Sequence, residues 1–223
     1  MKLVVREAAV TTGDGVQLAV HDYGPVAADH TVILLHGLCV SDAVWSHQID
    51  YLLRRDGNSS RVISYDHRGH GRSSNAPADT YRIDQLASDL AEVLTALKVG
   101  GPLTLVGHSM GGMAALAYLA RPSADRPVDP QGLVLAATTA GKLTHRGLGR
   151  LLATPGTGAL LRLVNHIPKH ALNLLAGPVC STLSRAWPEQ RTMLTAVAGA
   201  AASTPIPTAA GFLPTLRSYD QHR

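Results

Sequence analysis

The sequence feature that most constrains the fold is the segment Gly107-His108-Ser109-Met110-Gly111-Gly112. The apolar run Leu103–Val106 precedes it and predicts a buried strand, and residues 113–121 after it predict a helix. A strand, a sharp turn that carries a serine, and a helix must therefore follow one another directly. The glycines that flank the serine predict a turn so tight that a Cβ atom at either position would collide with the facing helix or strand.

This arrangement is the structural context in which a G-x-S-x-G motif presents a reactive serine. The turn is expected to hold Ser109 in a left-handed backbone conformation, so that its hydroxyl projects above the sheet. The N–H of Met110, at the positive end of the helix, would then be free to stabilise an oxyanion. We therefore predict that Ser109 is a nucleophile; the alternative is a glycine-rich turn that only packs the helix on the strand.

Strands and helices alternate along the first 140 residues. The hydrophobic pattern predicts strands at 3–11, 16–23, 31–35, 61–65, 103–106 and 133–137, and helices at 42–55, 82–98 and 113–121. The first two strands are joined by Thr12–Gly15, which is typical of a hairpin. The alternation predicts an α/β fold, with a mostly parallel sheet covered by helices on both faces.

The pattern changes after Gly141. Residues 142–223 predict short helices that are broken by Pro155, Pro168, Pro178, Pro188, Pro205, Pro207 and Pro214. We therefore divide the chain into an α/β core (1–140) and a helical cap (141–223). The cap is expected over the carboxyl edge of the sheet, where open α/β sheets bind ligands.

The charge is divided in a similar way. Residues 1–129 contain 11 Lys or Arg and 14 Asp or Glu, whereas residues 130–223 contain 9 Lys or Arg and only 2 Asp or Glu. The predicted cap is both apolar and positively charged, which predicts peripheral contact with anionic lipid. Its apolar residues are nine leucines and Val164, all between residues 148 and 175, and its cations are Lys142, Arg146, Arg150, Arg162, Lys169 and Arg185. The alternative is that the leucines pack the cap on the sheet. Without interleaved aromatic residues the cap is not expected to bind nucleic acid.

The two cysteines, Cys39 and Cys180, are too few for a disulfide framework. The N-terminus meets charged residues too early for a signal peptide, and the chain has no run of 18 apolar residues. We therefore expect a cytoplasmic protein.

Three motifs together resemble the α/β-hydrolase family, and the resemblance extends over essentially the whole chain. Val32–Gly37 resembles the family's strand with its His-Gly oxyanion turn, Asp66–Ser73 its D-x-R-G-x-G-x-S loop, and Gly107–Gly112 its nucleophile elbow. The resemblance implies that Ser109 is the nucleophile and that the backbone N–H groups of Leu38 and Met110 form the oxyanion hole. It further implies esterase- or lipase-like cleavage of a small lipophilic ester, with no metal or other cofactor.

Several histidines have competing interpretations. His36 is expected to stabilise the oxyanion turn rather than to transfer protons. His67 and His70 lie near Asp66, and the three residues together could suggest a metal site; the loop resemblance implies structural roles for both histidines instead. Asp66 could also be the triad acid, but it is expected to anchor its loop. His166 and His170 have a metal-capable spacing without a third ligand.

After the elbow the sequence departs from the family's pattern, which places an acid and then a histidine there. The later acids are Asp125, Asp129, Glu189 and Asp220, and the later histidines are His145, His166, His170 and His222. None follows a recognisable strand in the required order, so the triad acid and histidine are not found. We therefore expect that the last strands are missing and that the chain alone is inactive.

Three alternatives remain open: a non-catalytic binding protein of the same fold, a carbon–carbon bond hydrolase, and a cofactor-free haloperoxidase-like enzyme. If the last strands are missing, the predicted strand 133–137 becomes an uncharged apolar edge. Such an edge predicts self-association or a homo-oligomer.

Overall fold

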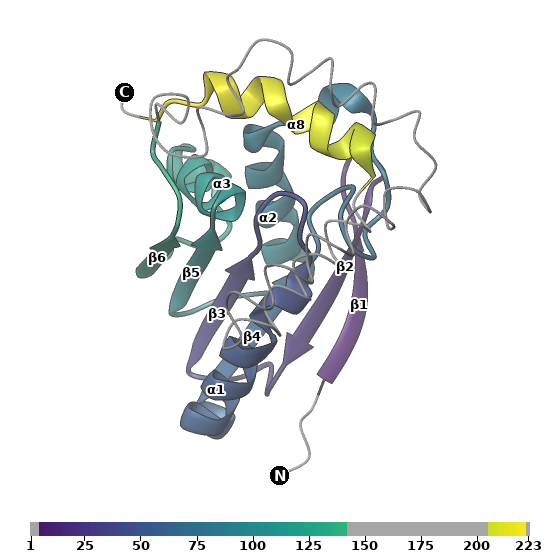
Figure 1. Ribbon diagram of the computed structural model, residues 1–223. Coiled ribbons are helices and arrows are strands. Elements are labelled where there is room, and N and C mark those ends of the chain that lie inside the picture. Colours follow the sequence, from purple (N-terminus) through teal and green to yellow (C-terminus); the bar gives the residue numbers. More distant parts are fainter. Residues whose placement is uncertain (1–4, 142–204, 222–223) are drawn as a thin grey trace, which may run out of the picture.

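A computed structural model describes residues 5–141 and 205–221 of the chain. In this part of the chain, six strands form one sheet with the order β1-β2-β4-β3-β5-β6 (Figure 1). The strands are β1 (Val5–Thr11), β2 (Gln17–Tyr23), β3 (His30–Leu35), β4 (Ser60–Tyr65), β5 (Leu103–His108) and β6 (Gly132–Ala136). β1, β2 and β4 pair in antiparallel fashion, while β4, β3, β5 and β6 are parallel. The predicted α/β fold with a mostly parallel sheet is confirmed.

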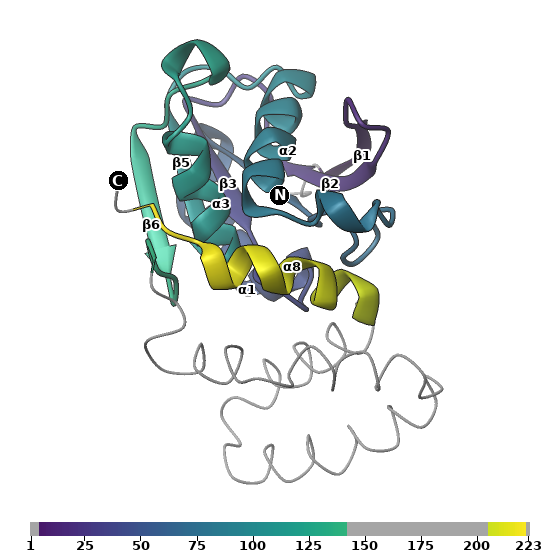
Figure 2. The same ribbon diagram turned by 90° about the horizontal axis from the view of Figure 1, so that it is seen from above.

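Helices cover both faces of this sheet, as the sequence predicts. α2 (Ile83–Ala96) and α3 (Met110–Leu119) lie on one face and α1 (Ser46–Asp56) on the other (Figures 1 and 2). Ile33 of β3 faces the core that contains α2 and α3, whereas its neighbour Leu34 faces the smaller core that contains α1. This alternation explains why the central strand β3 is apolar at every position from Val32 to Leu35. The predicted helix 42–55 differs at its start, because its first turn is a 3₁₀ helix.

The helix α8 (Ile206–Ser218) corrects the prediction that each proline breaks a helix. It is continuous although it contains Pro207 and Pro214. Pro207 lies in the first turn, where a missing N–H removes no hydrogen bond. Pro214 lies inside the helix and removes one bond, and the burial of Phe212 and Leu216 on the other side offsets that loss. In Figure 1, α8 crosses the end of the sheet at which the parallel strands stop.

After α8 the chain runs beside the segment that follows β6. Asp220 forms an isolated antiparallel bridge with Gly141, and the Gln221 N–H donates to the Ala140 oxygen at 2.7 Å. Most of the predicted cap, including every residue predicted to contact lipid, lies outside the described residues. No helix within 5–141 or 205–221 has the length and hydropathy needed to cross a membrane.

β6 forms one edge of the described sheet and is unusually exposed for an apolar strand. Leu133, Val134 and Leu135 expose 37%, 50% and 43% of their surface. Val134 is aligned with Val106 of β5, so both side chains lie on the α1 face of the sheet. The part of that face beyond α1 is therefore apolar and open.

Candidate active site

Ser109 occupies the turn between β5 and α3 in a conformation that few residues adopt. Its backbone angles are φ 50° and ψ −117°, well outside the regions that L-residues prefer. The turn is fixed on both sides: the Ser109 N–H donates to the Ala136 oxygen at 2.9 Å, and its carbonyl oxygen accepts the Thr138 hydroxyl at 2.7 Å. The predicted left-handed turn is confirmed, and Thr138 is a supporting residue that sequence analysis missed.

The flanking glycines are required for the reason that the sequence suggests. A Cβ atom at Gly107 would lie 2.5 Å from the Cα atom of Gly112, and one at Gly111 would lie 2.2 Å from the Leu35 oxygen. Both distances are far below van der Waals contact. α3 therefore begins directly against the end of β3.

The turn after β3 lies beside this serine. A Cβ atom at Gly37 would lie 3.2 Å from the Cβ atom of Ser109, so the next peptide N–H, that of Leu38, belongs to the same site. Among the described residues, neither the Leu38 N–H nor the Met110 N–H has a hydrogen-bond acceptor. Two unpaired N–H groups beside a strained serine are suited to binding a negatively charged oxygen.

The loop after β4 is anchored by buried charges. Arg68 is fully buried, and its guanidinium donates to Asp89 at 2.6 and 2.8 Å and to Asp14 at 2.8 Å. The Asp66 carboxylate accepts the N–H groups of Asp42 and Arg72 at 2.9 and 2.8 Å, and burial raises the pKa of this carboxyl. These contacts support the interpretation that Asp66 anchors its loop rather than acting as a triad acid.

Three buried histidines hydrogen-bond to the main chain. His36 Nδ1 lies 2.8 Å from the Gly37 oxygen, His67 Nε2 lies 3.1 Å from the His36 oxygen, and His70 Nδ1 lies 3.0 Å from the Arg68 oxygen. Burial lowers the pKa of His67 to about 3 and that of His70 to about 4, and holds the pKa of His36 well below its ordinary value. No set of three potential metal ligands occurs within the described residues.

No base is placed at the serine in this part of the chain. Within 5–141 and 205–221, no histidine or carboxylate hydrogen-bonds to the Ser109 hydroxyl. The Asp129 carboxylate pairs with Arg126 at 2.6 Å, and the backbone of Asp220 forms the isolated bridge with Gly141. Asp125 lies exposed in the 3₁₀ turn Ser123–Asp125. The other candidates for acid and base that sequence analysis named lie outside the described residues, namely His145, His166, His170, Glu189 and His222.

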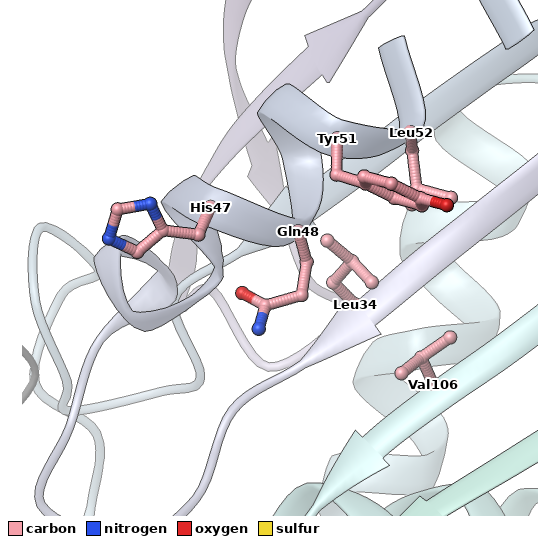
Figure 3. A pocket seen from close by; sticks show the side chains of 6 residues that line it. All are labelled: Leu34, His47, Gln48, Tyr51, Leu52 and Val106. Carbon is pink, nitrogen blue, oxygen red and sulfur yellow. The ribbon is translucent and has the colours of Figure 1, made fainter. Parts of the chain in front are cut away.

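A separate apolar groove of about 360 Å³ lies between α1 and β5 (Figure 3). It is lined by Leu34, His47, Gln48, Tyr51, Leu52 and Val106. The groove belongs to the α1 face of the sheet, and its lining does not include Ser109, Leu38 or Met110. It is therefore distinct from the serine turn.

Comparison with known proteins adds independent information. A family model described as "alpha/beta hydrolase fold" matches residues 30–149, just over half of the chain. The solved esterase EaEST from Exiguobacterium antarcticum is similar in structure, with a TM-score of 0.70 at 25% sequence identity. That likeness covers 97% of this chain and 75% of the esterase.

Two bacterial proteins are similar in sequence over the core. The bifunctional esterase/perhydrolase DCH of Acinetobacter calcoaceticus is 38% identical over 112 residues, which are 50% of this chain and 38% of that protein. The non-heme chloroperoxidase of Streptomyces lividans is 37% identical over 112 residues, with the same coverage. The match thus spans less than two fifths of the length of these relatives.

Proposed function

The chain belongs to the α/β-hydrolase fold family, and from this premise we propose that it is a serine hydrolase acting on a carboxylic ester or related acyl bond of a small lipophilic substrate. The observation that carries the proposal is the strained turn at Ser109, beside the N–H groups of Leu38 and Met110, which have no acceptor in the described part of the chain. A non-catalytic turn would not need a serine at φ 50°, because glycine adopts that conformation without strain.

The proposed reaction follows from this geometry. The Ser109 hydroxyl oxygen bonds to the acyl carbon while a general base takes its proton, and the carbonyl oxygen becomes negatively charged. The N–H groups of Leu38 and Met110 stabilise that charge. The alcohol then leaves with a proton, and water attacks the acyl–serine ester to release the acid and restore the hydroxyl.

The base and its acidic partner are assigned outside the described residues. Among the described histidines, His36, His67 and His70 hydrogen-bond to main-chain atoms, and His108 makes no described hydrogen bond to the Ser109 hydroxyl. A serine without a base retains only the contribution of the oxyanion hole and of substrate binding.

The names of the relatives support an acyl-transfer function. One is called an esterase/perhydrolase and another a chloroperoxidase that lacks haem, and the similar solved structure is an esterase. A haloperoxidase-like activity is therefore the runner-up within the enzyme class. Because the match covers a limited part of these relatives, their substrates remain proposals for this chain.

Hydrolysis of a p-nitrophenyl ester tests the proposal. In the protein that includes the residues supplying the base, we expect Ser109→Ala to remove the turnover of p-nitrophenyl butyrate. Ser123→Ala, which changes an exposed serine in a 3₁₀ turn, should leave that turnover unchanged. Equal turnover by wild type and Ser109→Ala would exclude Ser109 as the nucleophile. Saturable ester binding without turnover in either protein would favour the non-catalytic binding protein.

A further inference from the structure

The turn that carries Leu38 is held at three points by the loop after β4. His36 Nε2 accepts the His67 N–H at 2.9 Å, and the Asp42 N–H donates to Asp66 at 2.9 Å. Between these two contacts, the Cys39 N–H donates to His70 Nε2 at 3.2 Å. The contacts lie on both sides of Leu38, whose own N–H has no acceptor among the described residues.

Two imidazoles fix the two peptide planes that meet at Leu38. The Gly37 oxygen belongs to the same peptide as the Leu38 N–H, and His36 Nδ1 holds it at 2.8 Å. The following peptide ends in the Cys39 N–H, which His70 holds. A peptide whose C=O accepts a hydrogen bond is also a stronger N–H donor, because hydrogen bonds in a chain polarise one another.

The orientation of His70 is itself determined. Its Nδ1 faces the Arg68 oxygen at 3.0 Å and must therefore carry the proton, which leaves Nε2 as an acceptor. The side chain is fully buried, with its ring 5.3 Å from that of His36 and 5.9 Å from that of Phe212. Burial lowers the pKa of His70 to about 4, so the Nε2 lone pair is available at neutral pH.

Cys39 shows why this acceptor matters. Its φ is 59°, a left-handed conformation that a non-glycine residue keeps only when its surroundings hold it. Without an acceptor at Nε2, the partly buried Cys39 N–H would lose its partner, and rotation of its peptide plane would recover a partner at the expense of the turn. That rotation would move the neighbouring Leu38 N–H.

We infer that His70 is a positioning residue, which aims the Leu38 N–H at the developing oxyanion by accepting the Cys39 N–H. This inference rests on the proposed function, because it concerns the rate of acyl transfer at Ser109. The inference gives His70, the second histidine of the Asp66–Ser73 loop, a role in transition-state stabilisation beyond anchoring the loop.

Two variants separate the two hydrogen bonds of the ring. His70→Asn keeps a donor near the position of Nδ1 for the Arg68 oxygen and lacks the acceptor at Nε2. His70→Gln places its amide oxygen near the position of Nε2 and keeps the acceptor for Cys39. For p-nitrophenyl butyrate we expect His70→Asn to lower kcat about 10- to 100-fold with little change in KM, and His70→Gln to restore most of kcat.

The outcomes distinguish this inference from the proposed function. If Ser109→Ala removes turnover but both His70 variants keep the wild-type kcat, the positioning role is wrong and the proposed function stands. If Ser109→Ala has no effect, the proposed function is wrong. Equal losses of kcat in His70→Asn and His70→Gln would also overturn the positioning role, because restoration depends on the acceptor.

Amide hydrogen exchange gives a readout that does not require turnover. In His70→Asn we expect the Cys39 N–H to exchange at least about tenfold faster and the Leu38 amide resonance to shift. In His70→Gln both should stay near wild type, and the Ile33 N–H in β3 should remain protected in all three proteins. A Cys39 N–H that exchanges at the same rate in wild type and His70→Asn would overturn the inference, even if the chain shows no turnover.

Discussion

Gly111 lies so close to Leu35 that a Cβ atom on the glycine would be 2.2 Å from the leucine's carbonyl oxygen. This contact joins the start of α3 to the end of β3, and it sets the distance between the Ser109 turn and the turn that carries Leu38. The two halves of the candidate site are therefore positioned by one backbone contact. No side chain larger than that of glycine fits between them.

Gly111→Ala tests this contact. Alanine is the better helix former by about 1 kcal/mol, so without the clash this change would stabilise α3. We expect it instead to lower the free energy of unfolding by about 2 kcal/mol or more, because the Leu35 carbonyl is backbone and cannot move aside. Urea unfolding measures the change. Gly100→Ala, where a Cβ atom meets nothing within 4 Å, is the control and should change stability by less than about 1 kcal/mol; a stabilised Gly111→Ala protein would contradict the contact.

The buried ion pair of Arg68 and Asp89 makes a second prediction. Asp89→Ala leaves the guanidinium in the core with only the partly exposed Asp14 as a partner. We expect the free energy of unfolding, measured by heat or urea, to fall by about 3 kcal/mol, because an uncompensated buried charge is costly. Asp50→Ala removes an exposed pair with Arg54 at 3.9 Å and should cost less than about 0.5 kcal/mol. Similar small effects of both changes would show that water reaches Arg68.

Local sequence patterns predicted the strands, the core helices and the serine turn, because each depends on neighbouring residues. The apolar run of β3 and the glycines around Ser109 are examples: hydrophobic pattern and steric fit act over a few positions. The continuity of α8 through Pro214 was not predictable in this way. Its helix is maintained by the burial of Phe212 and Leu216 against distant elements, which no local propensity contains.

The support of the candidate site was predictable only in part. The motif around Arg68 indicated a structured loop, but its partners Asp14 and Asp89 are far away in the sequence and show no local signature. In the same way, the contact between Cys39 and His70 depends on how two loops meet at the carboxyl edge of the sheet. Sequence motifs thus located the loops, and only the fold revealed which atoms they join.

The buried histidines predict how stability depends on pH. Burial lowers the pKa of His70 to about 4 and that of His67 to about 3, and both titrate near 6.5 when the chain is unfolded. Between pH 6.5 and 4 the unfolded state therefore binds more protons than the native state, so stability falls as the pH falls. The slope for each histidine is at most about 1.4 kcal/mol per pH unit, and the raised pKa of Asp66 opposes it.

Urea unfolding at a series of pH values between 7 and 4 measures this dependence. The His70→Gln variant is the matched control, because it removes one titrating group and keeps the acceptor for Cys39. We expect its stability to fall less steeply than that of wild type over the same interval. Identical slopes would mean that His70 takes up protons in the native state as readily as in the unfolded chain.

The last prediction concerns the edge strand β6, which we propose as a self-association surface. The Ala136 oxygen accepts the Ser109 N–H, so by alternation Val134 turns its N–H and C=O groups to β5, and Leu133 and Leu135 turn theirs to the open side. The exposed side chains are self-complementary: if a second copy pairs in antiparallel fashion about Val134, Leu133 of each copy lies opposite Leu135 of the other. No charged residue lies between Pro130 and Gly141 to oppose this pairing.

Sedimentation velocity over a range of concentrations tests the pairing. Wild type should show a concentration-dependent dimer, and Val134→Lys should weaken it about tenfold or more, because two lysines would then face each other across the twofold axis. Val26→Lys adds the same charge at a valine that is 57% exposed and lies outside the sheet, so it should leave the dimer unchanged. An equal effect of the two lysines would mean that net charge alone controls association. A wild-type protein that stays monomeric at every concentration would show that this edge does not pair with itself, despite its apolar and uncharged surface.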